Sequence, residues 1–569
     1  MKKQAFLFLS SLPLCLSLSG CSVFSDYESE YEDEVTLTEA SYPLYNYNGE
    51  YAIKASSLKT YFVDGGALPY VDVSSFIDSL EGLYQTKYIS YSTTSSRKLI
   101  ASWRSQSATY TLTVDDEANT IKVNSATFFN LLYSTSGTNY SFAMKTVEAK
   151  TTQDSPKTFD LGSYGIEIYR KKSLVLIPFC LANTIFCSNN YHNIYFNGSA
   201  YYGTYFSFAM DDGTAIESAF KSRAWKGGSI PEDVASMNAK QFLFIMDNYY
   251  GLKEYYGISS FSSYLGQDIV SALSSTSEEK ARGGFYSSLF QKLDELHTSF
   301  DYYSFFCSST SLKPTYGENR TSYSEESKRL DASYEASYPD NEPVRYYDDT
   351  AIILAQSPIQ TGASSDLYDD SGNLKEDAYT KDSFYYMKEM LSRIEKHGGI
   401  KNVLLDLSRN GGGNMGAAFR MLGLMSDKDI VYGSKNMLSD SGYAVKVKID
   451  ANEDGSYDDD DAYSSYSWGI LTSAVTFSAA NYLACNASFS GAAKIFGERS
   501  GGGACPIVGF VNADGSTFHM SGPSVLKNAT IEESSIRFYD VQSGAKLDKE
   551  LNTEYFYGHD DMLDALFDD

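Results

Sequence analysis

The sequence predicts an α/β protein with a layered core at its C-terminal end, a helical segment before that core and a β-rich region in front. Three observations lead to this prediction. Short alternating segments fill residues 41–228, amphipathic helices follow in 229–309, and strands alternate with helices through 346–569. Alternation of this last kind is typical of helices packed on a sheet. A chain of 569 residues has room for two or more such units.

The chain begins with an export signal. Two lysines are followed by an apolar run that is too short to cross a bilayer, and residues 1–20 are therefore expected to be removed. The run ends in LSGC (18–21), which matches a lipobox, so cleavage would leave Cys21 for diacylation. An ordinary signal peptide cut nearby is the alternative. The acidic segment 21–40 predicts a flexible linker that holds the protein off the extracytoplasmic face of a membrane.

Charge and cysteine content exclude several classes of protein. The net charge is −27, and so acidic a surface repels nucleic acid. Beyond Cys15 and Cys21 there are five cysteines, without the spacing of metal ligands and too sparse for a disulfide framework. The expected protein is acidic, exported and tethered to the membrane.

The first two regions are predicted from periodicity. In the β-rich accessory region (41–228), ATYTLTVDDEANTIKVNS (108–125) alternates as a hairpin does. In the helical segment (229–309), NAKQFLFIMDNYYG (238–251) and GFYSSLFQKLDELH (284–297) have helical periodicity. Residues 310–345 are polar and without periodicity, which predicts a linker.

The core (346–569) contains the clearest elements. SFYYMKEMLSRIEKHGG (383–399) is an amphipathic helix with a glycine stop, and NVLLDLS (402–408) is a continuous apolar strand. NMGAAFRMLGLM (414–425) predicts the next helix and YSWGILTS (466–473) another strand. The order strand, helix, strand favours a layered α/β domain.

Two segments of this core share one architecture of strand, tight turn and helix start. NVLLDLSRNGGGN (402–414) turns on glycines, and WGILTSAVTFSAANYLA (468–484) places Ser478 near a helix N-terminus. Backbone N–H groups at such turns form an anion site, which acyl transfer needs for its tetrahedral oxyanion. A Gly-Gly-Gly turn alone is more often structural, but a serine beside it in the same domain favours a nucleophile.

These segments resemble the S41 serine peptidases, the group of the C-terminal processing, tricorn and interphotoreceptor-retinoid-binding proteins. The motifs LDELHTSF (293–300), LLDLSRNGGGN (404–414), TFSAANYLA (476–484), KIFGERSGGGA (494–504) and the tail YGHDDMLDALFDD follow in the family's order and cover roughly residues 229–569. The resemblance implies a crotonase- or ClpP-like α/β core with a helical cap over 229–309. It implies Ser478 as the nucleophile, Gly411 and Gly412 as the turn of the oxyanion hole, and the N–H of Ala479 as a further donor.

The general base is less directly indicated. The lysine of the processing branch would fall at Gly503, and Lys494 does not match it, so that serine–lysine pair is absent. The chain is closer to the tricorn-like branch, which uses a histidine, and His297 matches the histidine of the family's Asp-x-His-Thr motif. A histidine has a suitable pKa for this role. A histidine satisfied by a helix C-terminus is the alternative for His297.

Other candidates for the catalytic set are weaker. His519 and His559 are reserve bases, His397 fits a helix C-terminus, and His192 lies in the accessory region. The tricorn-like set also needs an acidic residue late in the chain. Glu532, Glu533 and Asp540 lie in range, and the sequence does not choose among them.

A second signal is DANEDGSYDDDD (450–461), which has the spacing of a calcium loop. The oxygen-bearing side chains at its ligand positions are Asp450, Asn452, Asp454, Asp458 and Asp461, with Gly455 at the turn. An acidic hairpin tip is the equal alternative. Calcium here would be structural, and the chemistry itself requires no cofactor.

The sequence therefore predicts a membrane-anchored, extracytoplasmic serine peptidase that acts on peptides or proteins and binds no nucleic acid. A non-catalytic peptide- or cell-envelope-binding lipoprotein on a degenerate peptidase fold is the alternative. A solute-binding lipoprotein of a transporter would share the leader but would not explain the ordered motifs.

Overall fold

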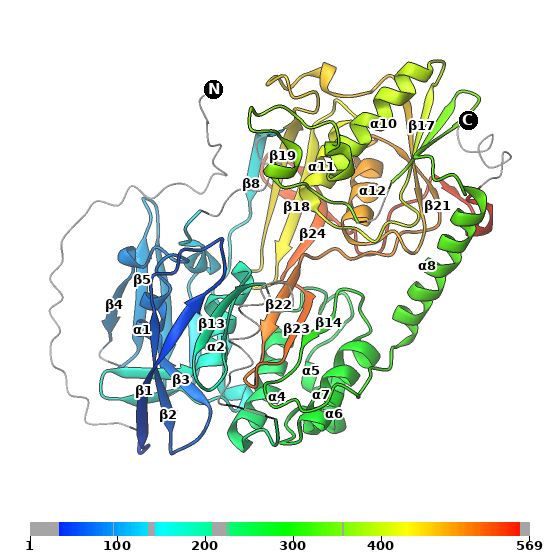
Figure 1. Ribbon diagram of the computed structural model, residues 1–569. Helices are drawn as coiled ribbons and strands as arrows, with labels where there is room; N and C mark the ends of the chain where they lie inside the picture. Colours follow the sequence, from blue (N-terminus) through cyan, green and yellow to red (C-terminus); the bar gives the residue numbers. More distant parts are fainter. Residues whose placement is uncertain are drawn as a thin grey trace.

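The computed structural model describes residues 33–94, 96–134, 143–206, 225, 227–355 and 358–557. The export signal, Cys21 and His559 lie outside these residues. Within the described ranges, no helix is long and apolar enough to cross a membrane. Figure 1 shows three parts: the N-terminal strands, a helical part beside them, and a C-terminal α/β part above.

The N-terminal region is β-rich, as its alternating segments predict. One sheet has the order β10-β11-β3-β2-β1-β13-β12, formed by Tyr169–Lys171, Leu174–Pro178, Pro69–Asp72, Ser57–Val63, Leu37–Asn46, Tyr201–Tyr205 and His192–Phe196. The other has the order β4-β5-β6-β7-β9, formed by Ser90–Thr93, Leu99–Arg104, Thr109–Asp115, Thr120–Val123 and Lys157–Asp160. The predicted hairpin is β6 and β7, with Val114 opposite Ile121. Helices α1 (Val73–Ser79) and α2 (Phe179–Phe186) pack against the first sheet.

The helical part contains α4 (Glu232–Tyr249), α5 (Phe261–Leu265), α6 (Gln267–Leu273) and α7 (Glu278–Tyr286). A π-helical turn, Ser287–Leu293, continues α7. A sheet of order β14-β23-β22 lies beside these helices, formed by Ser299–Tyr302, Thr517–Ser521 and Ile507–Val511. Two of its strands therefore come from the C-terminal part of the chain.

The N-terminal and helical parts share one hydrophobic core. A single cluster of buried side chains includes Val175 and Tyr201 of the first region, Phe242 of α4, and Phe510 and Phe518 of β22 and β23. The expected boundary at residue 229 therefore divides the sequence but not the core. Local periodicity cannot show this, because the shared packing joins residues far apart in the chain.

The C-terminal part is the predicted layered α/β core. Its main sheet has the order β15-β16-β17-β20-β21-β26, formed by Val344–Tyr347, Thr350–Leu354, Asn402–Asp406, Ser467–Thr472, Lys494–Gly497 and Lys549–Glu550. All neighbours in it are parallel except β15 and β16. Helices α10 (Ser383–His397), α11 (Met415–Gly423) and α12 (Ser478–Ser490) pack together over it in the second hydrophobic cluster. A short helix, α9 (Ser364–Leu367), precedes them.

A second sheet of this part includes one strand from the accessory region. Its order is β25-β24-β18-β19-β8, formed by Ile536–Tyr539, Ser524–Ile531, Ile430–Asn436, Ser441–Ile449 and Met144–Thr151. Strand β8 belongs to the accessory region in sequence but pairs with β19, and Figure 1 shows the two side by side. The accessory region is thus attached to the core by backbone hydrogen bonds.

The expectation of a featureless linker at 310–345 was wrong. Residues Glu318–Ser337 form helix α8, which runs from the helical part to the α/β part along the outside of the molecule (Figure 1). Its sequence lacks a broad apolar stripe because only Leu330 is buried. Contacts at its two ends, described below, replace the apolar face that a sequence pattern would reveal.

Candidate active site

Ser478 lies on a sharp turn between β20 and α12. Its φ is +55°, a left-handed backbone conformation that a non-glycine residue adopts at a cost in free energy. Two backbone hydrogen bonds hold the turn: Phe477 N–H donates to the Asn410 carbonyl (3.1 Å), and Ser478 N–H donates to the Gly502 carbonyl (2.8 Å). The serine is half-buried. A strained serine on a strand–turn–helix is the arrangement of a nucleophile elbow.

The glycine turn after β17 packs directly against this serine. A Cβ atom on Gly412 would lie 2.6 Å from Ser478 Cβ and 2.8 Å from the Ala479 nitrogen. The N–H of Ala479 is in the first turn of α12, where backbone donors have no partner within the helix. The structure therefore brings Gly412 and Ala479 together at Ser478, where the resemblance implies an oxyanion hole.

The donors of the glycine turn are not equivalent. Gly412 N–H donates to the side-chain oxygen of Asn410 at 2.9 Å, so this group already has an acceptor. Gly411 lies one residue earlier, where a Cβ atom would be 3.0 Å from the hydroxyl of Tyr323. The geometry therefore favours the N–H of Ala479 as a principal donor to an oxyanion.

His297 lies in the loop between the π-helical turn and β14 and is 9% exposed. Its ring packs against the ring of Phe477, the neighbour of Ser478, with 4.7 Å between centroids. His297 is 181 positions before Ser478 in the chain, and the fold brings it against the residue that precedes this serine. Within the described residues, no hydrogen bond joins His297 to Ser478; such contacts are often long before substrate binds.

Two residues that the sequence analysis missed orient His297. Ser521 Oγ lies 3.2 Å from His297 Nδ1 and donates to Glu295 Oε2 at 3.2 Å. Since that hydroxyl proton is given to Glu295, the Nδ1–H of His297 donates to Ser521 Oγ, which leaves Nε2 as the proton acceptor. Glu295 Oε1 also accepts the backbone N–H of His297 at 3.0 Å.

A sequence signal existed for one of these residues but not for the other. Glu295 is two residues before His297, at the acidic position of the Asp-x-His-Thr motif. Ser521 is 224 positions away from His297, and only the pairing of β14 with β23 brings it close. The acidic residues expected late in the chain lie elsewhere: Glu532 and Glu533 accept from Lys150 through their carbonyls, and Asp540 pairs with Lys527.

Burial shifts the pKa values of both His297 and Glu295. Burial, with a smaller electrostatic effect of the nearby His519, lowers the pKa of His297 to about 3. Burial raises the pKa of Glu295 to about 7, against the opposing effect of its hydrogen bonds to His297 and Ser521. At neutral pH the imidazole is therefore neutral and able to accept a proton.

The turn at Gly502–Ala504 leaves no room for a side chain at Gly503. A Cβ atom on Gly503 would lie 2.7 Å from the Phe477 ring and 2.8 Å from the Ser478 nitrogen, so a lysine has no room there. The amide oxygen of Gln542 accepts the N–H groups of Gly503 (3.1 Å) and Ala504 (2.8 Å) and holds this turn behind the serine. No sequence pattern indicates a role for Gln542.

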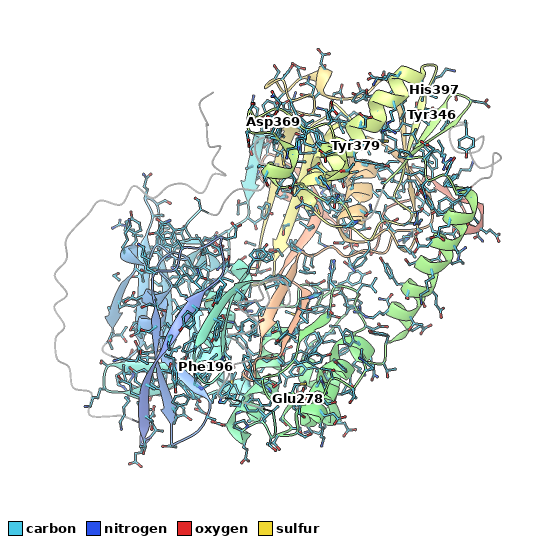
Figure 2. All side chains as sticks on the ribbon, in the orientation of Figure 1. Phe196, Glu278, Tyr346, Asp369, Tyr379 and His397 are labelled. Atoms are coloured by element: carbon cyan, nitrogen blue, oxygen red, sulfur yellow. The ribbon has the colours of Figure 1, made fainter. Side chains whose placement is uncertain are left out.

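The other three histidines in the described part of the chain have partners away from Ser478. His519 Nδ1 bonds to Asp301 Oδ1 at 2.7 Å, and His192 is buried against Asn48. His397 stacks on Tyr346 with 4.0 Å between centroids, and Figure 2 shows the two at the outer end of α10. The structural interpretation of His397 thus fits its position.

The acidic loop 450–461 folds on itself. Asp450 accepts N–H groups of Glu453 and Gly455, and Asp461 accepts those of Ala451, Asn452 and Asp458. Asn452 and Asp454 likewise accept N–H groups two residues ahead, as does Asp458. In the described chain, no group of three or more His, Cys, Asp or Glu side chains is arranged to hold a metal ion. Calcium binding here stays a prediction.

The fold and the site together define an α/β protein with a serine elbow beside a glycine turn. Residues 372–526 match the model of Peptidase family S41. No curated protein sequence matches the chain. A tricorn-like position within the family stays a prediction.

Solved structures show only distant similarity. The photosystem II D1 C-terminal processing protease is 17% identical over 36% of this chain and 42% of its own, with a TM-score of 0.25. A lipoprotein from Streptococcus agalactiae is 15% identical over 41% of this chain and 85% of its own (TM-score 0.25). Mature CPAF is 10% identical over 58% of this chain and 96% of its own (TM-score 0.35). The similarity to Peptidase family S41 therefore rests on the sequence match of residues 372–526.

Proposed function

We propose that the protein is a serine peptidase anchored through Cys21 to the extracytoplasmic face of a membrane, and that it cleaves peptide bonds through an acyl-enzyme. The observation that carries the proposal is the packing of Ser478, with its left-handed φ of +55°, against Gly412 and Ala479 on one side, while the ring of His297 contacts the adjacent Phe477. This arrangement supplies a nucleophile, backbone donors and a neutral base within one site.

In the proposed reaction, Ser478 Oγ attacks the carbonyl carbon and its proton passes to His297 Nε2. The N–H of Ala479 and the glycine turn stabilise the oxyanion, and Ser521 and Glu295 stabilise the imidazolium. The tetrahedral intermediate then expels the amine, which takes the proton from His297. Water, deprotonated by the same histidine, hydrolyses the acyl-enzyme and restores the serine.

The experiment is labelling of the mature protein by a fluorophosphonate–rhodamine probe, beside Ser478→Ala, His297→Ala and, as a matched control, His397→Ala. We expect labelling of the wild type and of His397→Ala, and none of the other two variants. Labelling that survives in Ser478→Ala would refute this serine as the nucleophile. Labelling that is lost in Ser478→Ala but survives in His297→Ala would assign the role of base to another residue.

A second candidate is a binding protein without turnover. Two observations favour it. The N–H of Gly412 already donates to the side chain of Asn410, and no hydrogen bond joins His297 to Ser478 within the described chain. A folded wild type that neither labels nor cleaves fluorescent casein would support this alternative. Partition of the wild type, but not of Cys21→Ala, into detergent after expression in bacteria tests the anchor in either case.

A further inference from the structure

Helix α8 is fixed to the loop that carries His297. The carboxylate of Asp294 accepts the N–H groups of Asn319 (2.6 Å) and Arg320 (3.2 Å) at the first turn of the helix. The guanidinium of Arg320 donates to the carbonyls of Glu295 (2.8 Å) and Thr298 (2.7 Å), which flank the histidine. The start of α8 and the His297 loop therefore form one hydrogen-bonded unit.

The other end of α8 is fixed to the core that carries Ser478. Asp331 pairs with Arg409 at 2.8 Å, and the Arg409 guanidinium lies 3.8 Å from the centre of the Tyr334 ring. Leu330 is fully buried in a cluster that includes Val475, three residues before the serine. The helix thus spans the junction between the two halves of the site.

Tyr323 projects from the middle of this span onto the site. Its ring lies 6.2 Å from the ring of Phe477, and its hydroxyl is 3.0 Å from the position that a Cβ atom on Gly411 would take. Gly411 is bonded to Gly412, whose own Cβ position is 2.6 Å from Ser478 Cβ. The phenol therefore lies on the glycine turn, next to the place where an oxyanion would form.

The hydroxyl of Tyr323 is also a weakly satisfied donor. Its acceptor is the carbonyl of Val475 at 3.5 Å, the outer limit of a hydrogen bond. Burial raises the pKa of Tyr323, so the phenol keeps its proton at neutral pH. A half-buried donor with so long a bond can turn to a better acceptor at little cost.

We propose that the Tyr323 hydroxyl is a further hydrogen-bond donor of the site, which bonds to the substrate carbonyl oxygen as that atom becomes an oxyanion. This donor would add to a glycine turn in which the N–H of Gly412 already donates to the side chain of Asn410. The inference rests on the proposed peptidase function. It explains why a helix that covers so little apolar surface is held at both ends.

The test compares Tyr323→Phe with Tyr334→Phe in the full mature protein; Tyr334 is on the same helix and packs on Arg409. The readouts are the limiting rate and half-saturation of fluorophosphonate labelling, kcat and KM on fluorescent casein, inhibition by phenylboronic acid, and Tm. For Tyr323→Phe we expect the labelling rate and kcat to fall about 10- to 100-fold while both half-saturation constants change less than about twofold. Phenylboronic acid, which forms a tetrahedral adduct on the serine, should bind more weakly by a similar factor.

Three results would overturn the inference. If the wild type is active and Tyr323→Phe has the same rates, the role of Tyr323 is refuted and the proposed function stands. A structural role for Tyr323 would follow from an effect on KM alone, or from an equal loss of rate in Tyr334→Phe. It would also follow if the Tm of Tyr323→Phe fell by more than about 5 °C. A folded wild type without labelling at Ser478 refutes the proposed function and this inference together.

Discussion

Gly412 and Ser478 are in direct contact: a Cβ atom on the glycine would lie 2.6 Å from the Cβ of the serine. Gly412 also has a φ of +102°, which L side chains rarely adopt. The contact joins two turns that are 66 positions apart in the chain. Any side chain at position 412 would therefore meet Ser478.

Gly412→Ala should abolish the labelling of Ser478. The added methyl group must displace the serine side chain or the Phe477 carbonyl, which would lie 2.6 Å away. We expect the rate of fluorophosphonate labelling to fall at least about 100-fold. The matched control is Gly372→Ala, which has a similar backbone strain at φ +82° but nothing within 4 Å of the new atom. Equal rates in both variants would contradict the contact.

The activity should rise with pH through about 7. Glu295 has a pKa raised to about 7 by burial, and its carboxylate stabilises the imidazolium that forms when His297 accepts a proton. His297 has a pKa lowered to about 3 and is already neutral in this range. The pH dependence of kcat on casein measures this limb. It should be absent in Glu295→Gln, with a kcat at pH 8 lower than that of the wild type; a limb that persists in this variant would assign it to another group.

The same carboxyl makes stability depend on pH. Because the folded pKa of Glu295 is raised from 4.5, the folded state holds its proton more tightly than the unfolded state does. The contribution is full below about pH 4.5 and is lost as pH rises through about 7, by roughly 3 kcal/mol. We expect the free energy of unfolding of the wild type, relative to Glu295→Gln, to fall over that window in urea titrations. A difference that rises with pH would contradict the raised pKa.

Asp294→Ala should weaken the hold of α8 on the His297 loop. It removes the acceptor of two backbone N–H groups at the start of the helix, a change that costs about 1 kcal/mol. We expect a Tm lower by a few degrees and a slower labelling of Ser478, because the base is less well positioned. Glu335→Ala, at an exposed position of the same helix, serves as the control and should change neither. An unchanged labelling rate in Asp294→Ala would separate α8 from the chemistry.

Calcium should stabilise the protein only weakly if the 450–461 loop binds it. The carboxylates of Asp450 and Asp461 accept N–H groups of the loop itself, and an ion would compete with these bonds. We expect millimolar Ca²⁺, but not Mg²⁺, to raise Tm by a few degrees in the wild type and not in Asp454→Asn. No shift under either ion would leave the acidic hairpin tip as the interpretation of this segment.

Much of the site could be predicted from the sequence because its parts are local. The apolar strand before Gly411 and the small residues around Ser478 each specify a strand, a turn and a helix start within a dozen residues. The alternation of the core is local in the same way, and α10, α11, β17 and β20 lie where the periodicity predicts them. The match of residues 372–526 to Peptidase family S41 includes several of these segments.

The tertiary structure decided what depends on distant contacts. Ser521 reaches His297 only through the pairing of β14 with β23, and the single hydrophobic core of the first two regions needs side chains from Tyr201 to Phe518. The sequence pattern did not predict helix α8, because polar contacts at its ends hold it in place rather than an apolar face. Local pattern shows which element a segment forms, whereas hydrogen bonds and packing across hundreds of residues determine which side chains meet.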